Sequence, residues 1–242
     1  MAEEVSAESG KPIDSDAPRA TANRSTTPGS EKFKEYIGEH WADRAEPIPA
    51  EREQARFAAA RRAALSSAFP GKRLVIPAGD RKQRSNDTDY LYRAHSAFAY
   101  LTGWGSDSEP GSVLVMAPTA TGHEATLYFR ERAGRDSDEF YANSDIGEFW
   151  IGPRPTPDAV ATELGIPTRA LAELDDLLAH ADDTWVVIRE ADPRVTAAID
   201  SARGDGNHRD ADIDRFQSEQ RLVKDAFEID EIRRAVAATA RG

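Results

Sequence analysis

Short apolar runs separated by turn and helix signals fill the middle of this chain, and their alternation narrows the folds open to it more than any other feature. Five such runs are typical of buried strands, because each is brief, apolar and bounded by residues that favour turns. They lie at 73–77, 98–101, 113–117, 126–129 and 185–188. Pro118-Thr-Ala-Thr-Gly122 joins the third run to the fourth, which predicts a hairpin-like connection.

Helix signals lie between and after these runs. Segment 51–65 is rich in alanine and arginine, which are strong helix formers, and it ends before Phe69-Pro70-Gly71. Thr156-Pro157 and Asp192-Pro193 each place a capping side chain before a proline at the first helical position. Strands interleaved with helices predict an α/β layer fold with a mixed sheet.

The two ends of the chain differ from its middle. Residues 1–46 are rich in small, polar and acidic residues and poor in large apolar ones, which predicts a disordered acidic tail. Inside it, four apolar residues at helical spacing predict either a short helix or a local hydrophobic cluster: Phe33, Tyr36, Ile37 and Trp41. Near the other end, Asp225 with Glu228 three residues later predicts a capped helix. That helix runs to the last residues, so we expect a chain cut before its next domain.

Composition excludes several classes of function. The 242 residues contain no cysteine, so disulfides, thiolate nucleophiles and cysteine metal sites are excluded. The formal net charge is −12 and no basic patch interrupts it, which argues against nucleic acid or a membrane surface as a partner. No secretory signal or long apolar span is present. We expect a cytoplasmic protein.

No sequence motif indicates an active site. The five histidines are scattered without a pair at metal-ligand spacing, and the acidic runs are typical of solvated surface in an acidic protein. The richest stretch is 85–104, which packs aromatic, hydroxyl and basic side chains into twenty positions. Arg93 in this stretch is suited to fork to a carboxylate. Such a stretch is either a core with a polar rim or a surface that faces a ligand.

Four elements in order resemble the N-terminal domain of Xaa-Pro aminopeptidase (aminopeptidase P), in the creatinase/prolidase group of metallopeptidases. The most specific element is Asp87-Thr-Asp-Tyr90, with Tyr92-Arg93 and Tyr100-Leu-Thr-Gly103. The others are Arg61-Arg62 with Phe69-Pro70-Gly71, then Trp150-Ile-Gly152 with Arg154, and finally Arg221-Leu-Val-Lys224 with Glu228-Ile229. Pro153 departs from the family, in which basic residues are common at that position.

The resemblance implies a mixed α/β domain over residues 47–212. It also implies that 213–242 are a linker and the first helix of a truncated pita-bread catalytic domain. The family enzyme hydrolyses the N-terminal residue from Xaa-Pro peptides with two metal ions, typically manganese, bound by that second domain. We therefore expect no catalytic residue and no metal ligand in this chain, and we expect the chain alone to be inactive.

The resemblance implies two roles for the N-terminal domain, namely contacts in a homo-oligomer and a wall at the substrate entrance. Asp87 and Trp150 match family residues that line this entrance, so we predict that both gate the substrate, a proline-containing peptide. An aromatic wall suits a proline ring, and a carboxylate suits a free amino terminus. The structural alternatives are that Asp87 caps a turn and that Trp150 is an ordinary core residue.

Two other interpretations remain open at this point. The chain also resembles part of a eukaryotic histone chaperone of the same architecture, so a non-catalytic interaction module with basic partners is one alternative. A prolidase or creatinase relative is the other, because the choice of substrate is made largely in the second domain.

Overall fold

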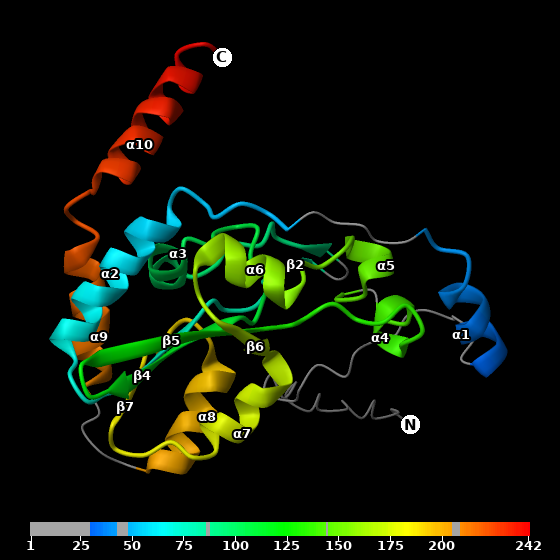
Figure 1. The fold of residues 1–242 in the computed structure, drawn as a ribbon, viewed down its shortest axis with the longest axis horizontal. Helices are drawn as coiled ribbons and strands as arrows, with labels where there is room; N and C mark the ends of the chain where they lie inside the picture. The colour runs from blue at the N-terminus through cyan, green and yellow to red at the C-terminus, as the bar shows by residue number, and fades with distance from the viewer. Residues whose placement is uncertain (1–29, 43–47, 86–87, 144, 205–208) are drawn as a thin grey trace, which may run out of the picture. The chain divides into compact units, whose positions relative to one another are not determined.

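The computed structural model describes residues 30–42, 48–85, 88–143, 145–204 and 209–242 (Figure 1). These residues fall into two compact units. Unit 1 contains residues up to 42 together with 133–153, and unit 2 contains 43–132 together with 154–242. Most of the predicted tail lies outside the described residues, so its disorder stays a prediction.

Unit 2 is built on a mixed five-stranded sheet with strand order β6-β5-β4-β1-β7. The strands are β1 (Arg73–Pro77), β4 (Val113–Thr119), β5 (Gly122–Phe129), β6 (Thr168–Ala170) and β7 (Trp185–Val187). β4 pairs antiparallel with both β1 and β5, whereas β7 and β6 pair parallel with their neighbours. The predicted α/β fold with a mixed sheet is therefore confirmed. The predicted hairpin is also present, with Thr119 paired to Gly122.

Alternating side chains along each strand enter two separate cores, because successive residues of a strand point to opposite faces of the sheet. In β1, Leu74 and Ile76 enter one core and Val75 enters the other. Leu127 and Phe129 of β5 join the first core. A sheet buried on both faces requires continuous apolar runs, which is why β1 and β4 contain almost no polar residue.

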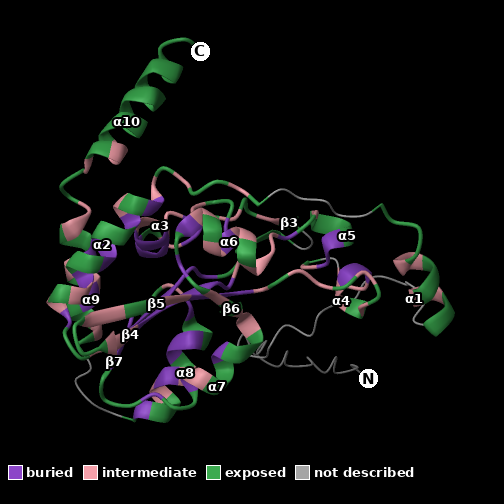
Figure 2. Ribbon diagram, in the orientation of Figure 1, coloured by how far each residue is buried: buried purple, intermediate pink, exposed green. Residues whose placement is uncertain are grey.

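Helices cover both faces of this sheet (Figures 1 and 2). The first core is closed by α2 (Ala55–Ala68), α3 (Ser96–Thr102), α6 (Pro157–Leu164) and α9 (Asp210–Gln220). The second core is closed by α7 (Leu174–Leu178), which follows the 3-10 turn Leu171–Glu173, and by α8 (Pro193–Arg203). A separate two-stranded ribbon pairs β2 (Gln83–Ser85) with β3 (Thr88–Asp89).

The run at 98–101 is helical, so its prediction as a strand was wrong. It forms most of α3, where His95 accepts a hydrogen bond from the Ala97 N–H and Gly103 ends the helix in the left-handed conformation. Phe98, Leu101 and Thr102 are buried on one helical face. A run of four apolar residues is compatible with a strand or with a helix. Here the capping residues at both ends stabilise the helix.

The last two helices of the chain are α9 and α10, and the second of them lies where the sequence predicts a capped helix. The expected boundary between residues 212 and 213 falls inside α9, and the domain division itself stays a prediction. α10 (Ala226–Thr239) begins at Asp225, whose side chain accepts from the Glu228 N–H, so the predicted capping box is confirmed. Arg61 of α2 donates two hydrogen bonds to the Asp225 carboxylate, at 2.9 and 2.6 Å, and one to the Tyr100 carbonyl at 3.0 Å.

The described residues of unit 1 form three short helices, α1 (Glu31–Gly38), α4 (Asp138–Tyr141) and α5 (Glu148–Ile151). α1 is the short helix, one of the two alternatives that the apolar spacing predicts, and it ends before Trp41. Ser30 caps it by accepting from the Phe33 N–H. Tyr36 does not lie on the packed face of α1, because 72% of the surface of this residue is exposed.

No helix among the described residues combines the length and the hydropathy needed to cross a membrane.

Candidate functional site

Trp150 lies on α5, and the chain before this helix folds tightly enough to require a glycine. A Cβ atom on Gly147 would lie 2.5 Å from the Asn143 carbonyl oxygen and 2.7 Å from those of Glu139 and Phe140. The glycine therefore lets the chain turn directly from α4 into α5. This turn places the four-residue helix that carries Trp150 against α4.

The Trp150 ring is held in place and yet remains accessible. Its indole N–H donates a 2.7 Å hydrogen bond to the Tyr141 carbonyl, and its ring meets Phe149 edge to face at 5.3 Å. About half of the residue, 52%, is exposed. An aromatic ring with its one polar group satisfied and half its surface open is suited to receive an apolar ligand group. The alternative that Trp150 is an ordinary core residue does not fit this exposure.

Further aromatic side chains surround Trp150. Phe140 and Tyr141 are buried, whereas Phe149 and Trp41 are 46% and 44% exposed. The Phe149 ring contacts Phe140 at 6.2 Å and Trp41 at 6.4 Å. Sequence reasoning missed Phe149 because it is one residue among many aromatic ones, and no spacing distinguishes it.

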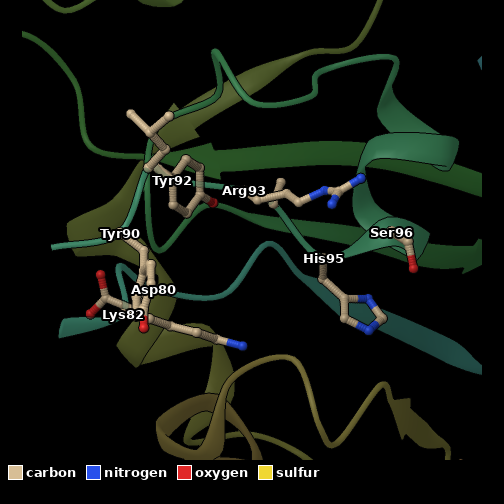
Figure 3. A pocket seen from close by; sticks show the side chains of 9 residues that line it. Asp80, Lys82, Tyr90, Tyr92, Arg93, His95 and Ser96 are labelled. Carbon is tan, nitrogen blue, oxygen red and sulfur yellow. The ribbon is translucent and has the colours of Figure 1, made fainter. Parts of the chain in front are cut away.

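Asp87, the second predicted gating residue, lies outside the described residues. The stretch that contains it lines a pocket of about 490 Å³ in unit 2. Figure 3 shows Asp80, Lys82 and Tyr90 on one side of this pocket and His95 and Ser96 on the other. The stretch 85–104 therefore supplies both a core helix and residues that line a pocket, and a ligand-facing role for the latter stays a prediction.

The polar groups of this pocket differ in their partners. The Tyr92 hydroxyl donates to the Gly79 carbonyl at 3.2 Å, and burial raises the pKa of Tyr92 to about 12, so the phenol stays protonated. His95 contacts a Glu190 carboxylate oxygen at 3.1 Å. Within the part of the chain that the structure describes, Lys82 and Arg93 form no ion pair. Counting only described residues, the pocket thus presents two cations without an ion-pair partner in a strongly acidic chain.

The manganese pair that the resemblance implies has no matching ligand set among the residues that the structure describes. Two-metal sites are built from several carboxylate and imidazole groups that converge on one point. The described residues contain no group of three or more histidine, aspartate or glutamate side chains placed to hold a metal ion.

Comparisons with known proteins agree on one family. The family model "Aminopeptidase P, N-terminal domain" matches residues 58–185. Xaa-Pro aminopeptidase 1 of Streptomyces coelicolor is 41% identical over 252 residues, which cover 100% of this chain and 49% of that protein. Xaa-Pro aminopeptidase 2 of the same organism is 40% identical over 204 residues, which cover 84% of this chain and 42% of that protein. The chain spans about half the length of these curated relatives.

Solved structures give the same family. Proline aminopeptidase P II from Yersinia pestis matches with a TM-score of 0.56 and 26% identity, over 75% of this chain and 42% of that one. An Escherichia coli aminopeptidase P variant in complex with substrate matches with a TM-score of 0.50 and 27% identity, over 63% and 33%. The family model covers more than half of the residues, and the mixed sheet agrees with these structures. The chain therefore belongs to the Xaa-Pro aminopeptidase family, in which it corresponds to the aminopeptidase P N-terminal domain.

Proposed function

We propose that this chain is the N-terminal part of a Xaa-Pro aminopeptidase, where it walls the substrate entrance and forms contacts between subunits of a homo-oligomer. In this proposal, a metal-binding domain outside this chain hydrolyses the bond before proline. The curated relatives are about twice as long as this chain, which is long enough to include such a domain. A pair of manganese ions bound there would activate the attacking water and polarise the scissile carbonyl.

The observation that supports the gating role is that the Trp150 ring is fixed in position and partly exposed. Its ring is anchored through the indole N–H and remains 52% exposed, so it offers a fixed apolar surface without a change of conformation. A proline ring is compact, apolar and already rigid, so its loss of entropy on stacking against such a surface is small. Asp87 has the complementary role in this proposal, with its carboxylate facing the free amino terminus of the peptide.

Peptide binding by the chain tests the gating role. In ¹⁵N-labelled protein, the indole N–H signal of Trp150 should shift when Ala-Pro-Ala is added, and it should shift less with Ala-Ala-Ala. Because Trp150→Ala lacks this signal, it is compared by isothermal titration calorimetry, in which it should abolish the difference in affinity between the two peptides. Equal responses to both peptides, or none, would count against a proline-receiving wall.

A turnover assay tests the division of labour. The purified chain with added manganese should release no alanine from Ala-Pro-Ala, because the proposal places the catalytic groups elsewhere. Robust release would overturn that part of the proposal. Sedimentation velocity should detect a species larger than the monomer, and a monomer at all concentrations would refute the oligomer contact.

A further inference from the structure

We propose that the N-terminal segment Ser30–Ala42, termed the strap below, completes the surface that receives a proline-containing peptide, with Trp41 as its third exposed ring. This inference rests on the proposed function, because it concerns the same aromatic wall. The strap lies outside the residues that the family model matches. It therefore adds recognition groups that the matched domain does not supply.

The strap is fixed to α4 and to the segment just before α4 by contacts along its length, all within unit 1. At its start, the Phe33 ring meets Tyr141 edge to face at 5.4 Å. Lys34 pairs with Asp138 of α4 at 3.2 Å. At its end, Arg135 donates to the Ala42 carbonyl at 3.0 Å. Contacts at both ends hold the segment between them in a defined position.

The chain reverses after α1 in a way that returns Trp41 toward the helices. His40 adopts a positive φ of 65°, which is uncommon for a residue with a side chain. The Trp41 indole N–H then donates to the Ile37 carbonyl at 2.6 Å. The ring meets Phe140 at 5.6 Å and Phe149 at 6.4 Å. Arg135 lies over the ring at 5.1 Å, and 44% of Trp41 remains exposed.

Three partly exposed rings thus follow one another through edge contacts. Trp41 touches Phe149 at 6.4 Å, and Phe149 touches Trp150 at 5.3 Å. Each ring keeps between 44% and 52% of its surface open. Proline-containing segments bind aromatic surfaces of this kind because their rings are preformed and pack flat against them. A row of rings also offers contact to the residues on either side of the proline.

Charge indicates which end of a peptide the surface receives. The described residues of unit 1 carry eight acidic side chains against three basic ones. Glu35 and Asp145 have no basic partner among them. An Xaa-Pro peptide carries its protonated amino terminus one residue before proline, so the net negative charge of these residues favours it over a carboxylate end, while Arg135 already covers part of the Trp41 ring. The occupant is therefore the amino-terminal Xaa-Pro segment of a peptide.

The test compares Trp41→Ala, Trp41→Phe and Tyr36→Ala in the whole chain. Tyr36 is the matched control, because it is another aromatic residue of the strap and 72% of its surface is exposed. Ala-Pro-Ala is titrated into each protein while the Trp150 indole signal is followed. We expect Trp41→Ala to weaken binding about threefold to tenfold, Trp41→Phe to restore most of it, and Tyr36→Ala to leave it unchanged.

Each other outcome refutes a distinct statement. If Trp41→Ala and Tyr36→Ala bind as the unaltered chain does, the strap has no part in recognition, although the wall at Trp150 stands. If the unaltered chain binds no proline peptide, the proposed gating role fails as well. Acetylated Ala-Pro-Ala should bind more weakly, and equal binding would refute recognition of the amino terminus. If Trp41→Ala instead dissociates an oligomer, the surface is an interface between copies and the peptide proposal is wrong.

Discussion

Replacing Arg61 with methionine tests whether one buried guanidinium fixes α10 to the rest of unit 2. Only 9% of the Arg61 side chain is exposed. It donates to Asp225 and to the Tyr100 carbonyl, lies 3.5 Å from Glu228 and stacks over the Tyr100 ring at 4.1 Å. Methionine keeps most of the length and apolar volume of arginine, so the change removes mainly the charge and its hydrogen bonds.

The expected loss of stability follows from the exposure of the partners. Breaking a buried ion pair by removing one partner costs roughly 3–5 kcal/mol, because the other charge is left without compensation. The side chains of Asp225 and Glu228 are 29% and 21% exposed, so water replaces part of the lost interaction. We therefore expect Arg61→Met to lower the free energy of unfolding by about 2–3 kcal/mol. For a domain of this size, the melting temperature then falls by roughly 5–10 °C.

Urea unfolding followed by circular dichroism measures this loss, and amide hydrogen exchange locates it. Exchange should accelerate first in α10, since none of its residues is buried. Arg233→Met is the control, because Arg233 is 75% exposed and pairs only with Asp230 on its own helix. That change should cost at most about 0.5 kcal/mol. If Arg61→Met costs no more than Arg233→Met, the reasoning about the buried guanidinium is wrong.

Two further predictions concern acid stability and the turn before Trp150. The hydrogen bond from Arg189 lowers the pKa of Asp200 to about 2, so its stabilising contribution is complete above about pH 4 and is lost as the pH falls through 2. Urea titrations between pH 5 and 2 should therefore show a shallower loss for Asp200→Asn, and an unchanged slope would contradict this. Gly147→Ala should lower stability by more than about 1 kcal/mol, because the new Cβ meets backbone carbonyls and not mobile side-chain ends. It should also shift the Trp150 indole signal, and an unperturbed signal would show that the turn tolerates a side chain.

β1, β4, β5 and β7 could be predicted because strands buried in a sheet leave a strong apolar signal, whereas β6 was missed because none of its three residues is buried. β1 and β4 are almost entirely apolar. Phe98–Leu101 shows where the signal fails, since the same composition suits a helix once His95 and Gly103 cap it. α4 and α5 have four residues each, too few for any period to appear.

The candidate site was harder to predict, because its residues meet only in three dimensions. Trp150 was identified through the family resemblance, and its aromatic neighbours carry no motif. Trp41 precedes Phe149 by about one hundred residues in the sequence. Its ring contacts Phe149 only because the chain reverses at His40. Arg61 was part of a matched motif, but its partner Asp225 lies 164 residues later. Contacts of this kind depend on the fold and are not encoded in local composition.

Arg61 binds the N-terminal cap of α10, so a small rotation at this end displaces the other end of the helix by a larger distance. The helix has 14 residues and no buried one, so its far end lies about 20 Å from its capped start at 1.5 Å per residue. Figure 2 shows that it is exposed along nearly its whole length. A rotation of about 10° at the cap would therefore move the far end by roughly 3–4 Å. The contacts of Arg61 with Asp225 and of Phe57 with Phe227 hold the start of the helix, so a small change at these contacts is magnified at its far end.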